Sequence, residues 1–78
     1  VGVLDHKAGE DWPLHYQKQA TEYNLVLEGK LKVDGRVFTR NEGFVVAPGE
    51  AIKPHFLSDT RVLVVKVPSD PKDKVVVR

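Results

Sequence analysis

Three polar residues whose side chains could act together lie within the eight-residue stretch HYQKQATE, which runs from His15 to Glu22. His15 and Gln17 are two residues apart, and Glu22 follows five residues after Gln17. Because alternate residues of a strand point to the same side, His15 and Gln17 can face one interior, where Glu22 on a following antiparallel strand would meet them. Either the three residues line a site, or they are ordinary polar residues near a strand end.

The rest of the chain predicts an all-β domain that could position such a site. Valine is abundant, no 11-residue window has helical periodicity, and glycines and prolines break the chain every few residues. The predicted strands are 1–7, 14–17, 22–27, 30–33, 36–39, 44–47, 55–57, 62–67 and 74–77. We therefore expect a sandwich or barrel of short strands, followed by a loop in the segment PSDPKDK and a last strand that pairs with another strand or another chain.

The clearest local signal is the segment KLKVDGRVFT, in which Asp34-Gly35 separates two alternating runs. Such a pair supplies the positive φ angles of a two-residue type I′ turn, so a tight hairpin is expected here. Its inward face is expected to hold Leu31, Val33 and Phe38, with Arg36 at its end.

Length and charge limit the classes of protein that remain. The 78 residues allow one domain, residues 1–78, with a small core that oligomerisation or a bound metal would stabilise. There is no cysteine, which excludes disulfides and thiolate ligands. The charged residues of both signs are scattered along the chain and sum to a net charge of +1, which argues against a nucleic-acid partner.

No apolar run is long enough to span a membrane, and no signal peptide is recognisable, so a soluble, cytoplasmic protein is expected. The chain has no methionine and begins inside a strand-like run, as a domain trimmed at its N-terminus would.

Two segments carry a resemblance to a known family. GEDWPLHYQKQATEYNLVLEG resembles the first signature of the cupin superfamily. Gly9, His15, Glu22 and Gly29 match that signature in type and spacing, and Gln17 stands where the signature has a second His. GFVVAPGEAIKPHFLSD is similar to the second signature, in which His55 and Asp59 fit the ending, although five residues separate Gly49 from His55 where the family usually has two.

The resemblance implies a jelly-roll barrel with a metal ion at its centre. His15, Glu22 and His55 would be the metal ligands, and Gln17 would be either a fourth, weaker ligand or a neighbour of the metal. Two imidazoles and a carboxylate with open coordination positions suit Mn or Fe, with Ni, Co or Zn as alternatives. His6 matches no part of either signature and is expected to have a structural role.

Two functions agree with this set of residues. The first is a metal-dependent enzyme acting on a small polar substrate, sugar-like or acid-like. The alternative is a non-catalytic module that binds or senses a ligand, which is favoured by the lack of a general base apart from the metal ligands. Asn24 and Arg36 are candidates for substrate binding, although an interior amide satisfied by the barrel and a solvated arginine would explain them equally well.

A further expectation concerns the second face of the strand at 22–27. Tyr23, Leu25 and Leu27 lie opposite Glu22 and Asn24 on this strand. If the polar residues face the interior, the apolar ones point outward, and a second subunit would cover them. A homodimer is therefore expected.

Overall fold

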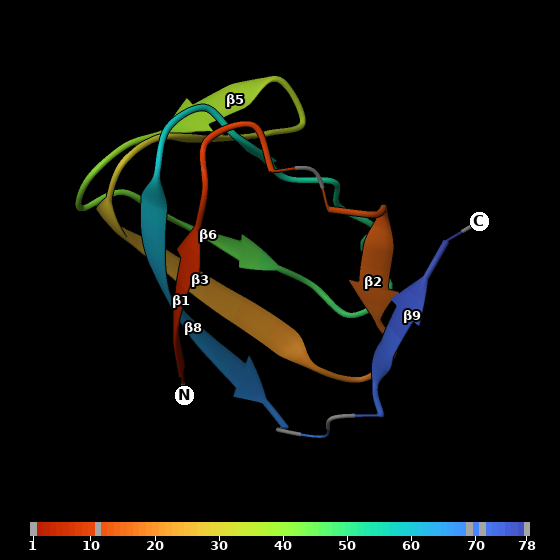
Figure 1. Ribbon diagram of the computed structural model, residues 1–78. Coiled ribbons are helices and arrows are strands. Elements are labelled where there is room, and N and C mark those ends of the chain that lie inside the picture. Colours follow the sequence, from red (N-terminus) through yellow and green to blue (C-terminus); the bar gives the residue numbers. More distant parts are fainter. Residues whose placement is uncertain (1, 11, 69, 71, 78) are drawn as a thin grey trace.

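The all-β prediction is confirmed by a computed structural model, which describes residues 2–10, 12–68, 70 and 72–77 (Figure 1). This part of the chain contains nine strands and no helix. The strands are β1 (Gly2–His6), β2 (His15–Gln17), β3 (Thr21–Glu28), β4 (Leu31–Val33), β5 (Arg36–Phe38), β6 (Gly43–Val46), β7 (His55–Phe56), β8 (Thr60–Val67) and β9 (Lys74–Val76). Residue 1 of the predicted first strand and residues 69 and 71 of the predicted loop lie outside the described part.

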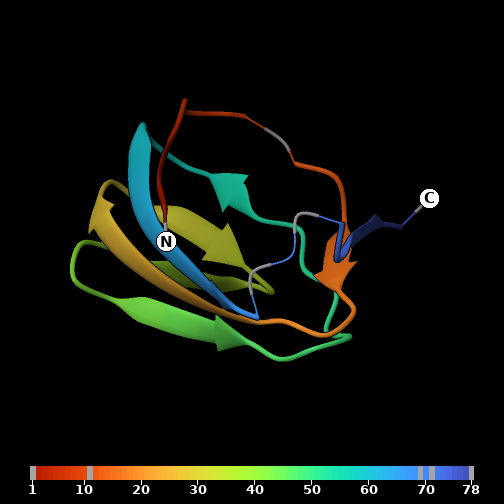
Figure 2. The same ribbon diagram turned by 90° about the horizontal axis from the view of Figure 1, so that it is seen from below.

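All strand pairs are antiparallel and form three sheets. One sheet has four strands in the order β1-β8-β3-β6, a second has the order β5-β4-β7, and β2 pairs with β9. Both ribbon views show β2 and β9 side by side at one end of the molecule, away from β1 (Figures 1 and 2). Within the described residues, no helix is long and apolar enough to cross a membrane.

The predicted hairpin is formed by β4 and β5. Asp34 and Gly35 have φ angles of 51° and 79°, and Val33 pairs with Arg36 across the turn. The inward residues are buried as expected: they are Leu31, Val33 and Phe38. Arg36 is exposed at the end of this face, where its guanidinium carbon lies 5.2 Å from the centre of the Phe38 ring.

The hydrophobic core lies between the four-stranded and three-stranded sheets. The first sheet contributes Val26, Val46 and Val62, and the second contributes Leu31, Val33, Phe38 and Phe56. Ile52, on the segment that precedes β7, completes this buried cluster. Because both sheets place alternate residues inward, the polar residues at neighbouring inward positions are brought to the edge of the same core.

Asp73 fastens β9 to the turn between β2 and β3. Its buried carboxylate accepts the backbone N–H of Gln19 at 3.0 Å and that of Ala20 at 2.9 Å. Burial by itself raises the pKa of Asp73. The hydrogen bonds from the N–H groups of Ala20 and Gln19, together with the charge of Lys18, lower it by a larger amount, so the pKa lies below the ordinary value.

We therefore expect Asp73→Asn to destabilise the protein at neutral pH and to make its stability fall less steeply as the pH is lowered. A carboxyl whose folded pKa is depressed contributes stability above its unfolded pKa, and this contribution is lost as the pH falls through the folded pKa. Urea unfolding at pH 7 and at several values below 4 measures the difference between wild type and variant, which should shrink as the pH falls. Asp34→Asn, at the exposed hairpin turn, is the matched control. A difference that stays constant with pH would contradict the assignment.

Candidate functional site

Polar residues of β3 face the interior of the molecule. Glu22 and Asn24 are buried next to Val26 on the inner face of the strand, whereas Tyr23 and Leu25 are exposed on the outer face. The alternation predicted from the sequence is therefore confirmed. A carboxylate and an amide stand two residues apart on a strand, which separates their attachment points by about 7 Å.

These two side chains line a cavity of about 60 Å³. The other lining residues that carry a polar group are His6, Trp12 and His15. The rest are apolar, with Leu31, Phe44, Ile52, Phe56 and Val62 among them. The lining comes from both large sheets and from β2. A mostly apolar hollow with a few polar groups that converge on it is the usual form of a small-molecule site.

His15 is held in one orientation by its backbone neighbours. Its Nδ1 lies 2.9 Å from the carbonyl oxygen of Pro13. A carbonyl only accepts hydrogen bonds, so Nδ1 carries the proton and donates it, and in the neutral ring Nε2 keeps a free lone pair. The strand position opposite His15 is taken by Ile52, and the two residues exchange backbone hydrogen bonds of 2.8 and 3.0 Å.

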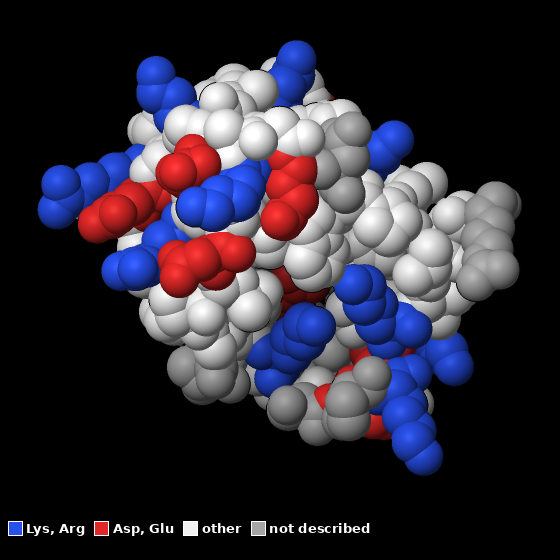
Figure 3. Space-filling view, in the orientation of Figure 1, with Lys and Arg blue, Asp and Glu red and all other residues white. Residues whose placement is uncertain are grey.

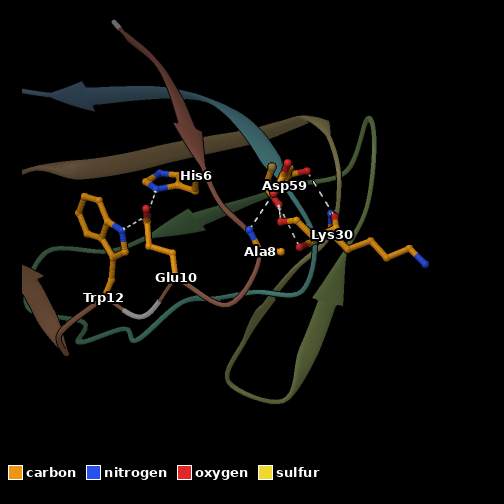
Figure 4. A network of polar contacts seen from close by, with 8 residues as sticks. His6, Ala8, Glu10, Trp12, Lys30 and Asp59 are labelled. Carbon is orange, nitrogen blue, oxygen red and sulfur yellow. Dashed lines mark hydrogen bonds and ion pairs between the residues drawn. The ribbon is translucent and has the colours of Figure 1, made fainter.

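A second imidazole lines the cavity in a place that the sequence did not single out. His6, on β1, donates its Nδ1–H to Glu10 Oε2 at 2.6 Å, and the indole N–H of Trp12 donates to the same oxygen at 2.7 Å (Figure 4). These two hydrogen bonds hold the pKa of Glu10 below its ordinary value. The His6 ring also stacks on Phe56, with 4.1 Å between ring centres. His6 therefore belongs to the site as well as to the core.

Gln17 is buried on the inner face of β2 but does not line the cavity. It is 2% exposed, and neither its Nε2 nor its Oε1 has a hydrogen-bond partner among the described residues. Asn24, 8% exposed, likewise has no partner for its Nδ2. An unpaired buried amide group costs about 1–3 kcal/mol of stability, and such groups are concentrated where a ligand or an ordered water supplies the missing partner.

The structure does not bring the remaining predicted residues to the cavity. His55 is exposed on β7, opposite Lys32, because the next residue, Phe56, occupies the inward position of this short strand. Arg36 is exposed at the start of β5 and lines a separate surface groove with Phe38. Of the six predicted site residues, three line the cavity: His15, Glu22 and Asn24.

The expected set of metal ligands is therefore not assembled. Where a third protein ligand would face His15, the structure places the aliphatic side chain of Ile52. In the part of the chain that the structure describes, no group of three or more His, Cys, Asp or Glu side chains is arranged to hold a metal ion. Aliphatic carbon cannot coordinate a metal, so Ile52 supplies no ligand at the position opposite His15.

Comparison with protein-family models finds no match to this sequence. Comparison with the curated proteins finds no significant match either.

Proposed function

We propose that the chain is a small cupin-type domain, with its strands in a jelly-roll arrangement, that binds a small hydroxylated molecule in the cavity between its sheets. The jelly-roll assignment is supported by the strand order. One sheet runs β1-β8-β3-β6, and the bridge between His15 and Ile52 places β2 beside the segment that leads into β7 of the sheet β5-β4-β7. Two facing sheets with long crossing connections are typical of jelly rolls.

The observation that carries the ligand class is the unpaired hydrogen-bonding capacity at the cavity. Asn24 Nδ2 is a buried donor without a partner in the described part of the chain. Glu22 can only accept when ionised, and Nε2 of neutral His15 also accepts. A hydroxyl group both donates and accepts, so a molecule with several hydroxyls would satisfy all three. The cavity has the volume of only a few water-sized groups, so it accommodates one edge of such a molecule.

Asn24→Leu is expected to stabilise the protein without ligand by about 1 kcal/mol and to abolish ligand binding. It removes a buried unpaired amide and replaces it with a side chain of similar volume, which trades function for stability. Urea unfolding measures the first effect. NMR titration with glycerol and simple sugars measures the second effect. Glu22→Gln is a second variant at the cavity. Tyr23→Phe, on the outer face of the same strand, is the matched control. A destabilised Asn24→Leu protein that binds as wild type does would refute the proposal.

Metal binding is the second candidate, and one observation favours it. A hydrogen bond from Nδ1 to a carbonyl, as made by His15, is the arrangement that orients metal-binding histidines. In this candidate His15 and Glu22 alone would hold the ion, with Gln17 close by on β2. The metals to test are those that the sequence predicts, Mn or Fe ahead of Ni, Co and Zn.

For the assembly we propose a homodimer formed by the outer face of the four-stranded sheet. Tyr23 pairs with Val45 and Val65, and Leu25 pairs with Leu63, so adjacent strands carry one continuous apolar surface. Tyr23 and Val45 are 48% and 58% exposed. At the margin of this face the charges of Asp5 and Arg61 neutralise each other in an ion pair of 2.8 Å. A neutral apolar face can stack on a second copy of itself without repulsion between like charges.

We expect wild type to be dimeric at micromolar concentration and Val45→Lys to be monomeric, because a buried, unpaired ammonium at the centre of the interface is unfavourable. Light scattering coupled to size exclusion measures both masses. Val37→Lys, at an exposed position of β5 in the other sheet, should remain dimeric. A monomeric wild type would overturn this interface.

A further inference from the structure

We propose that the ligand of the cavity carries an anionic group, a carboxylate or a phosphate, and that Lys66 and Lys74 bind it. This inference rests on the proposed function, since it specifies the chemistry of the same ligand. Neither lysine belongs to the residues that the sequence singled out. Their role follows from the register of the strands, from the contacts of Lys74 and from the unpaired amide of Gln17.

The strand register places both lysines on inward faces. Lys66 on β8 is the direct partner of Glu22 on β3, and Lys74 on β9 is the direct partner of Gln17 on β2. Direct partners in an antiparallel pair project their side chains to the same face of the sheet. Glu22 and Gln17 are both buried, so the two lysines extend from the same inner faces, and each is half-buried.

Lys74 lies against a wall of the cavity. Its Nζ is 4.4 Å from the centre of the Trp12 ring, and Trp12 is one of the lining residues. A cation at this distance from an indole face is held by the ring's electrons. The ammonium group of Lys74 is therefore kept beside the cavity, whereas an unrestrained lysine would extend into water.

The charges around Lys74 favour an incoming anion. Desolvation lowers the pKa of Lys74, and repulsion by Lys66 lowers it further, whereas the carboxylate of Glu22 raises it. The partly desolvated ammonium group of Lys74 is thus close enough to feel both the charge of Lys66 and that of Glu22. In Figure 3 an acidic side chain is recessed in a hollow between groups of Lys or Arg atoms. An anion bound between the lysines would relieve both the desolvation and the repulsion.

Gln17 supplies a neutral donor at the same place. Its amide is 2% exposed and has no partner among the described residues, and it projects from the same face as its strand partner Lys74. Its Nε2–H group can donate to a carboxylate or phosphate oxygen. The carboxylate of Glu22 would repel an anionic group but would accept a hydrogen bond from a hydroxyl. The hydroxyl end of the ligand would therefore lie at Glu22 and the anionic end at the lysines. The ligand class is accordingly a hydroxy acid or a phosphorylated polyol.

Trp12 makes the site measurable because it is the single tryptophan of the chain. Titration with inorganic phosphate at constant ionic strength should change the fluorescence of Trp12, and glycerol 3-phosphate should bind at least about tenfold more tightly than glycerol. The variants Lys66→Gln and Lys74→Gln should each lose most of this preference. Lys32→Gln, which removes an exposed lysine of β4, is the matched control and should keep it.

Three outcomes would overturn the proposal: phosphate leaves the Trp12 signal unchanged, the variants Lys66→Gln and Lys74→Gln keep the preference, or Lys32→Gln loses it equally. NMR signals of the Asn24 side chain distinguish this failure from failure of the proposed function. If glycerol perturbs the Asn24 amide in wild type and in Lys74→Gln while no anion preference exists, the hydroxyl site stands and the anion site is refuted. If neither glycerol nor glycerol 3-phosphate perturbs Asn24, both proposals are refuted.

Discussion

Replacing Gly29 by alanine is expected to remove a large part of the free energy that stabilises the folded protein. Gly29 follows β3 with a φ of +89°, and a Cβ atom there would lie 2.2 Å from the backbone oxygen of Asp59 and 2.8 Å from the Cα of Thr60. The left-handed conformation costs alanine about 1–2 kcal/mol, and the overlap with backbone atoms costs more than that. A domain of this size has roughly 4–12 kcal/mol in total, so we expect a loss above about 4 kcal/mol.

Gly35→Ala separates the steric effect from the conformational one. Gly35 has a similar φ of +79°, but nothing lies within 4 Å of its added Cβ. This variant should lose only about 1–2 kcal/mol. Urea unfolding followed by circular dichroism measures both variants. Equal losses for the two would show that the turn at Gly29 can move away from Asp59, contrary to our expectation.

A double substitution, Gln17→His with Ile52→His, is expected to produce strong metal binding at the cavity. Ile52 faces His15 across a strand bridge, and Gln17 lies on the same face of β2 as His15. Together with Glu22, three imidazoles and one carboxylate would then point inward, a donor set that suits Mn, Fe, Ni, Co or Zn. At a metal concentration of about 100 times the Kd, the stabilisation is about 2.7 kcal/mol, or roughly 10–20 °C in Tm.

Wild type should change by less than about 1 °C under the same conditions. In the double variant, adding Glu22→Gln should remove most of the response, whereas adding His55→Ala should leave it unchanged because His55 is exposed. Differential scanning calorimetry with and without each metal provides the measurement. A wild-type protein that is stabilised as strongly as the double variant would contradict this prediction and would establish metal binding by the native residues.

The sequence predicted the elements because their signals are local. Asp34-Gly35 requires a two-residue turn, and the alternation of Glu22, Asn24 and Val26 with Tyr23 and Leu25 fixes which face of β3 is buried. Strand bounds differ from the structure by a residue or two, as at β7, which ends at Phe56 instead of residue 57. The division of the strands among three sheets depends on pairing between distant segments, for which single residues carry no signal.

The same distinction explains the site. His15, Glu22 and Asn24 were found because their spacing along two adjacent strands determines where they point. Which residue completes the site from a distant segment depends on register, and here Ile52 pairs with His15 while His55 points outward. His6 also escaped recognition. The signals for it were its place on a predicted strand and a carboxylate four residues later at Glu10, and both are too common to single out a residue.

The pairing of β2 with β9 has a consequence for how the chain folds. Within the described part, only β4 and β5 are joined by a tight turn, and every other pair links segments that are distant in the sequence. Such a topology folds slowly, on a scale of milliseconds to seconds. During synthesis His15 and Gln17 wait for Lys74–Val76, which lie far along the chain, so β2 gains its partner strand only after all the intervening strands have been made.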